Sequence, residues 1–112
     1  MARLTSATLV SAMVRRVHDA GGSAMQLARG DATAGGILIL TLEKGANPCF
    51  FERGIGPNGA PALVRSGPAE LADPLAVLEY WQRRRARDPD LWVVELDIAG
   101  AERFAAETFG LD

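Results

Sequence analysis

Cysteine and histidine are almost absent from this 112-residue chain, which has only Cys49 and His18. One cysteine cannot form a disulfide within the chain, and a zinc site made of Cys and His side chains would need more of them. No Ser–His–Asp or Cys–His catalytic arrangement is visible. Cys49 precedes two phenylalanines and is typical of a small core residue. We therefore predict no catalytic residue, no cofactor and no metal ligand, although the composition leaves open a site made only of carboxylates.

Long apolar runs and a strong net charge are also missing. No run reaches the roughly 20 apolar residues of a transmembrane helix, and the first residues lack the features of a signal peptide. A net charge of -2 gives no general attraction to nucleic acid or to anionic membranes. The length and the 48% hydrophobic content are ordinary for a globular protein. We expect one domain over residues 1–112, cytoplasmic and without membrane contact.

The most informative stretch is the apolar run from Gly36 to Leu42. In a strand, alternate side chains point to opposite faces, so a strand with one wet face should alternate apolar and polar residues. This run does not alternate: one face would carry Ile37, Ile39 and Thr41, and the other Leu38, Leu40 and Leu42. Its β-branched residues and short length favour a strand over a helix. The pattern predicts a central strand that is covered on both faces.

Periodicity and turn signals give the remaining elements. A first helix should follow the N-cap residues Thr5 and Ser6 and end at Gly21–Gly22, and a second should begin at Asp73–Pro74 and end near Arg87. For the second helix we predict a buried stripe of Leu71, Leu75, Leu78 and Gln82, with Val77 and Trp81 beside it. Strands are predicted at 23–29, 36–42, 49–53, 62–65 and 91–97, and a last helix at 100–109.

This order predicts an α/β fold with a mixed sheet of four to five strands and helices on both faces. Strand 23–29 would form a β-hairpin with strand 36–42, and the antiparallel meander would continue to an edge strand at 62–65. After the crossover helix, strand 91–97 would lie beside strand 23–29 and parallel to it. The alternative is a two-layer α+β fold in which a homodimer covers the second face.

Three stretches together resemble the DUF1491 family, small proteins of alphaproteobacteria with no assigned function. They are Arg3–Leu4 with Arg15–Arg16, Arg29–Ala32 with Ala34–Gly35, and Asp88–Glu95. The resemblance covers nearly the whole chain and implies a bacterial, cytoplasmic, single-domain protein. It implies no activity, cofactor or site residue.

The best candidate ligand-binding residues are Arg15, Arg16, Arg29 and Asp31, which would meet if the first helix packed across the first hairpin. A pair of arginines could hold a carboxylate or phosphate, with Asp31 fixing one guanidinium. The alternative is structural: an aspartate in a turn usually bonds its own backbone. We hypothesise that Asp31 is coupled to Arg16 or Arg29.

Two further groups have both a functional and a structural interpretation. Glu95 and Asp97 share one face of a strand and could serve a metal or acid–base site, but they are more typical of a solvated strand end. We retain Glu95 as a candidate ligand-binding residue. The run Arg83–Arg87 beside Tyr80 and Trp81 has the composition of a phosphate-binding surface, yet cations also stabilise a helix C-terminus. Because the domain is not basic, we predict no nucleic-acid binding.

The leading functional prediction is a non-enzymatic binding or protein-interaction domain, with apolar surface at Phe50, Phe51 and Trp81. Its partner would be an unknown protein or a small anionic ligand, and a homodimer is one arrangement. The competing prediction is a small enzyme or anion-binding domain that uses the Arg/Asp/Glu cluster. The third is nucleic-acid binding through Arg83–Arg87.

Overall fold

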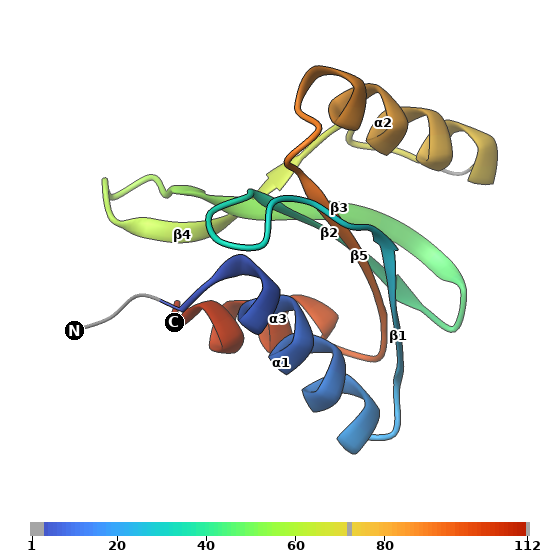
Figure 1. The fold of residues 1–112 in the computed structure, drawn as a ribbon. Coiled ribbons are helices and arrows are strands. Elements are labelled where there is room, and N and C mark those ends of the chain that lie inside the picture. Colours follow the sequence, from blue (N-terminus) through green and yellow to red (C-terminus); the bar gives the residue numbers. More distant parts are fainter. Residues whose placement is uncertain (1–3, 72, 112) are drawn as a thin grey trace.

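A computed structural model describes residues 4–71 and 73–111 and shows a mixed five-stranded sheet with three helices (Figure 1). The strand order is β1-β5-β2-β3-β4. The elements are α1 (Ser6–Asp19), β1 (Ser23–Ala28), β2 (Ile37–Glu43), β3 (Ala46–Ile55), β4 (Pro61–Ser66), α2 (Pro74–Arg87), β5 (Trp92–Asp97) and α3 (Ala101–Phe109). The predicted α/β class is confirmed. The described part of the chain holds no helix that is long and apolar enough to cross a membrane.

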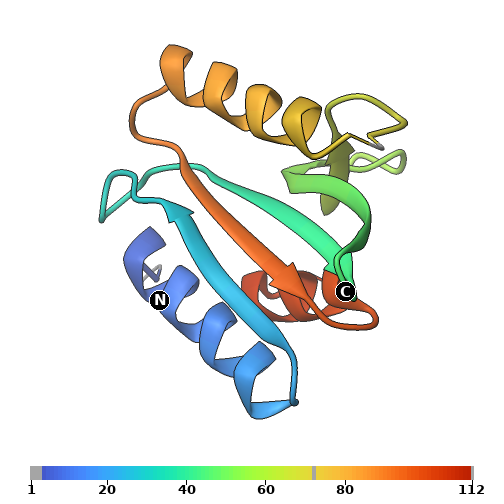
Figure 2. The same ribbon diagram turned by 90° about the vertical axis from the view of Figure 1, so that its right-hand side faces the viewer.

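Strand β2 lies in the middle of the sheet and is covered on both faces, as its sequence predicts. Helices α1 and α3 lie on one face and α2 lies on the other (Figures 1 and 2). Ile37 and Ile39 belong to the core beneath α1 and α3, whereas Leu38 and Leu40 belong to the core on the α2 side. The alternative two-layer fold is therefore wrong.

The predicted hairpin between β1 and β2 is also wrong, because β5 lies between these strands. β5 is antiparallel to β1 and parallel to β2, so it lies beside the first strand as predicted but with the opposite orientation. Both faces of β5 are buried: Trp92, Val94 and Leu96 face α1 and α3, and Val93 faces α2. A strand that is apolar on both faces is most stable inside a sheet, whereas β1 has exposed positions and forms an edge.

The segment 29–36 spans the start of β5 and joins three parts of the fold. The backbone N–H of Asp31 donates to the carbonyl of Asp90 (3.0 Å), and the indole N–H of Trp92 donates to the carbonyl of Asp31 (2.7 Å). The first turn of α1 donates to the same segment, with Ser6 N 3.1 Å from Thr33 O. A Cβ at Gly30 or Gly35 would collide with the Asp90 carbonyl. Two of the stretches that resemble DUF1491 are therefore in direct contact with each other.

Helix α2 begins as predicted, with Asp73 as N-cap and its carboxylate 2.9 Å from the N–H of Leu75. Its predicted buried stripe is right for Leu71, which is buried, and wrong for Leu75 and Leu78, which are 57% and 39% exposed. Within the helix Val77 is the one buried residue, and Tyr80 and Trp81 are packed beside it. The helix packs on the sheet through Val77, Tyr80 and Trp81, so Leu75 and Leu78 remain exposed.

The turn between β2 and β3 is tighter than the sequence predicts. Lys44 and Gly45 have positive φ angles (52° and 76°), and β3 begins directly afterwards at Ala46. The carboxylate of Asp97 accepts hydrogen bonds from both backbone N–H groups, at 2.7 Å and 2.9 Å. Asp97 therefore holds this turn against the end of β5.

Candidate functional site

A groove with a volume of about 840 Å³ lies between α2 and the sheet. Its floor comes from β1, β5, β2 and β3, and one wall comes from α2 and the segment before it. Most of the lining side chains are apolar: Leu27, Leu40, Leu42, Leu71, Val77, Leu78 and Trp81. A groove of this size and composition is typical of small-molecule sites.

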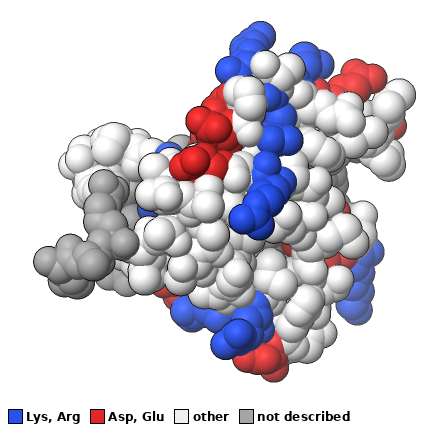
Figure 3. Space-filling model, viewed as in Figure 1, with Lys and Arg blue, Asp and Glu red and all other residues white. Residues whose placement is uncertain are grey.

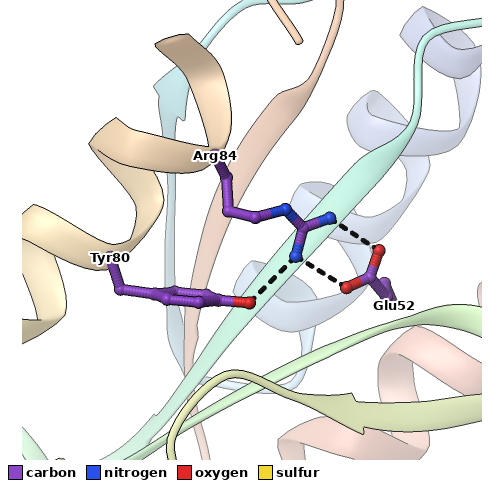
Figure 4. A network of polar contacts seen from close by, with 3 residues as sticks. All are labelled: Glu52, Tyr80 and Arg84. Carbon is purple, nitrogen blue, oxygen red and sulfur yellow. Dashed lines mark hydrogen bonds and ion pairs between the residues drawn. The ribbon is translucent and has the colours of Figure 1, made fainter. Parts of the chain in front are cut away.

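A polar network fixes α2 above the sheet at the side of the groove (Figure 4). The two terminal nitrogens of Arg84 donate to the two carboxylate oxygens of Glu52 on β3, each at 2.8 Å, and Nη1 also donates to the Tyr80 hydroxyl at 2.9 Å. The Tyr80 ring packs on Phe50, with 4.7 Å between ring centroids. The bond from Arg84 lowers the pKa of Glu52, and burial opposes this shift.

Glu95 is the charged residue of the groove floor. It lies on β5 opposite Leu40 of β2 and Met25 of β1, so apolar side chains flank it on both neighbouring strands. Burial, and then the nearby charge of Asp97, raise the pKa of Glu95. No hydrogen bond or ion pair joins its carboxylate to another described side chain or backbone group. The groove therefore offers one half-buried carboxylate in a mainly apolar surface.

Two other charged residues line the groove, Arg65 from β4 and Glu70 from the segment before α2. Both are exposed. Arg65 donates from Nη2 to the carbonyl of Ala69 at 2.9 Å, which holds this segment against β4. With Glu95 included, the lining carries two carboxylates and one guanidinium.

The structure does not bring the predicted site residues together. Arg15 lies on α1 beside His18, at a second and smaller hollow, and Arg16 pairs with Glu107 of α3 at 2.7 Å. Both arginines are on the helix that covers the face opposite α2, whereas Glu95 lines the α2 side. A site that unites these arginines with Glu95 is not formed among the described residues.

Arg29 and Asp31 have structural partners of their own. The guanidinium of Arg29 lies over the Trp92 ring, 5.3 Å from its centroid. The carboxylate of Asp31 accepts from the backbone N–H groups of Thr33 (3.2 Å) and Ala34 (2.9 Å). Ion pairs of Asp31 with either arginine are absent from the described structure. The contacts support the alternative interpretation of Asp31, a residue that caps its own turn.

Two arginines of the run Arg83–Arg87 make contacts within the fold. Arg84 belongs to the network with Glu52, and Arg85 donates to the carbonyls of Arg29 (3.0 Å) and Pro89 (2.7 Å). On the face seen in Figure 3, a narrow stripe of basic side chains runs down the middle, with acidic side chains beside it. The absence of nucleic-acid binding by this run stays a prediction.

Sequence reasoning missed the groove, because its lining comes from distant segments. Leu27, Leu42 and Leu78 are ordinary apolar positions in the sequence, and nothing in their spacing links them. The predicted apolar surface at Phe50 is wrong, since that side chain is buried below Tyr80. Trp81 does line the groove. Among the described residues, no group of three Cys, His, Asp or Glu side chains could hold a metal ion.

Comparison with protein families gives one match, to "Protein of unknown function (DUF1491)", over residues 4–106. The chain belongs to this family. The comparison with curated proteins found no match.

Solved structures similar to this DUF1491 protein include proteins of two bacteria. A crystal structure of a DUF1491 family protein from Caulobacter crescentus is 25% identical, with a TM-score of 0.76, and the match covers 91% of this chain and 94% of that one. A solution structure of an A. tumefaciens protein is also 25% identical, with a TM-score of 0.68 and 87% of each chain covered. The resemblance seen in the sequence is therefore confirmed at the level of family and fold.

Proposed function

We propose that this DUF1491 protein is a non-enzymatic binding protein, and that its ligand is a small amphipathic molecule held in the groove between α2 and the sheet. The observation that carries this proposal is the groove itself, a mainly apolar hollow of about 840 Å³ with one carboxylate in its floor. Exposed apolar surface is costly to leave in water, and hollows of this kind commonly mark binding sites.

The competing enzyme or anion-binding function depended on a cluster of Arg15, Arg16, Arg29, Asp31 and Glu95. These residues lie in separate places, and several already have partners within the fold. No observation on the described residues favours that function over ligand binding in the groove.

The two exposed leucines of α2 provide a matched test. Leu78 lines the groove, whereas Leu75 is on the same helix and does not. We would titrate the protein with Nile red, a neutral apolar dye that fluoresces in apolar surroundings. Leu78→Gln should weaken dye binding about three- to tenfold, because it replaces an apolar contact by a polar one. Leu75→Gln should leave binding unchanged.

Tryptophan fluorescence gives an independent signal for the same site. Trp81 lines the groove, and Trp92 is buried on the opposite face of the sheet. Dye binding should quench the emission of Trp81, and the quenching should disappear in Trp81→Phe, where Trp92 alone remains. Absence of dye binding, or equal weakening by the two leucine variants, would contradict the proposal.

A further inference from the structure

We infer that the ligand of this groove carries a protonated amine, which forms an ion pair with the carboxylate of Glu95. The inference rests on the proposed ligand-binding function and adds to it the chemical class of the ligand. It starts from the position of Glu95, which projects from β5 between Leu40 and Met25 on the face below α2.

The carboxylate of Glu95 has no partner among the described residues, whereas two other carboxylates on the same face of the sheet have partners. Asp97, two residues further along the same face, is occupied by the N–H groups of Lys44 and Gly45. Glu52, on the same face of the sheet, is occupied by Arg84. A carboxylate flanked by apolar side chains loses hydration that only a cation or a hydrogen-bond donor can replace.

The charges around Glu95 favour a cation over an anion. Asp97 lies on its own strand, β1 and β2 contribute Met25 and Leu40 beside it, and the opposite rim carries Glu70 and Arg65. Arg65, the one basic residue of the lining, is exposed and bonded to the carbonyl of Ala69. The field along the floor is therefore negative, and an anionic ligand would meet repulsion from both Glu95 and Asp97.

The apolar residues that line the groove indicate the chemistry of the rest of the ligand. Leu27 and Leu42 of the floor, with Leu78 and Trp81 of α2, would cover an alkyl or aromatic body. Amine and apolar body together describe a cationic amphiphile. The raised pKa of Glu95 agrees with this, since a carboxylate that lacks a partner is the one whose charge a bound cation stabilises most.

Three probes with the same alkyl chain separate the head group from the body: n-octylamine, n-octanol and octanoate. We would measure their dissociation constants at pH 7.5 by displacement of Nile red from the full chain. Octylamine should bind about three- to tenfold more tightly than octanol, as expected for a partly exposed charged pair, and octanoate should bind most weakly. Glu95→Gln should lower the affinity for octylamine to that for octanol. The affinity for octanol itself should not change.

Glu79→Gln is the matched control, because it removes the same charge from an exposed position on α2 that does not line the groove. It should leave all three affinities unchanged. Circular dichroism and retained octanol binding establish that Glu95→Gln is folded.

The outcomes separate this inference from the proposed function. If octanol and Nile red bind and octylamine has no advantage, or its advantage survives in Glu95→Gln, the amine inference is wrong and the groove remains a binding site. Tightest binding of octanoate would also overturn it. If neither the dye nor any of the three probes binds, the proposed function is wrong and the inference is lost with it.

Discussion

The guanidinium of Arg84 and the carboxylate of Glu52 form a two-point ion pair, with both N–O distances at 2.8 Å, that joins α2 to β3. The pair is only partly exposed, with side-chain exposures of 29% and 27%. Val77 is the one buried residue of α2, and this pair and its bond to Tyr80 add polar contacts that attach the helix to the sheet. The same contacts therefore hold α2, which forms one wall of the groove, against the sheet.

We predict that Glu52→Gln lowers the free energy of unfolding by about 1–2 kcal/mol at neutral pH, because Arg84 loses its ionic partner. The effect should depend on pH. The pKa of Glu52 is lowered in the folded state, so its contribution is complete above its ordinary pKa and is lost as the pH falls through the lowered value. In urea unfolding at a series of pH values, the gap between wild type and variant should be constant above about pH 5 and close below it. A gap independent of pH would show that the carboxylate charge is not what holds Arg84.

The central strand gives a second prediction. Leu40 is buried on the α2 side and Ile39 on the side of α1 and α3. Leu40→Ala and Ile39→Ala should each cost about 2–5 kcal/mol, because each leaves a cavity in a packed core. Urea unfolding of both variants measures this. A large loss for one variant alone would mean that one of the two cores contributes little to stability.

The turn that contains Asp31 gives a third prediction. Its carboxylate accepts from Thr33 and Ala34, and the asparagine side chain can accept the same bonds. Asp31→Asn should therefore be nearly neutral, whereas Asp31→Ala should cost about 1 kcal/mol. Double-mutant cycles with Arg16→Gln and Arg29→Gln should show additive effects. Measurable coupling would restore the hypothesis that the charge of Asp31 holds one of these arginines.

Adjacent glycines before β2 give a fourth prediction. A Cβ on Gly35 would collide with the Asp90 carbonyl, whereas on Gly36 it would meet the Leu91 side chain at 3.4 Å, an ordinary contact. Gly35→Ala should cost about 3 kcal/mol or more, because the backbone of segment 29–36 must move away from β5. Gly36→Ala is the control and should change stability by less than about 1 kcal/mol. Similar melting temperatures for the two variants would mean that this segment can move away from β5 without loss of stability.

Local patterns in the sequence determined the elements. Thr5 and Asp73 cap α1 and α2 because each side-chain oxygen accepts a bond from its own first turn. The doubly apolar run at Ile37–Leu42 predicted a central strand with helices on both faces, because alternation decides how many faces of a strand are buried. The family resemblance was carried by short stretches of the same kind.

The tertiary structure alone decided the strand order and the groove. β5 lies between β1 and β2, and just before β5 the chain at Asp90 lies against Gly30 and Gly35, which are 55 to 60 residues away in the sequence. Likewise, Leu75 and Leu78 have the spacing of a buried stripe, yet Val77, Tyr80 and Arg84 make the contacts, because Phe50 and Glu52 of β3 lie below that side of α2. Glu95 was visible as a candidate residue, but the rest of the groove lining comes from four other strands and a helix. Side-chain spacing specifies which residues share a face of one element, and only the packing of elements determines what that face meets.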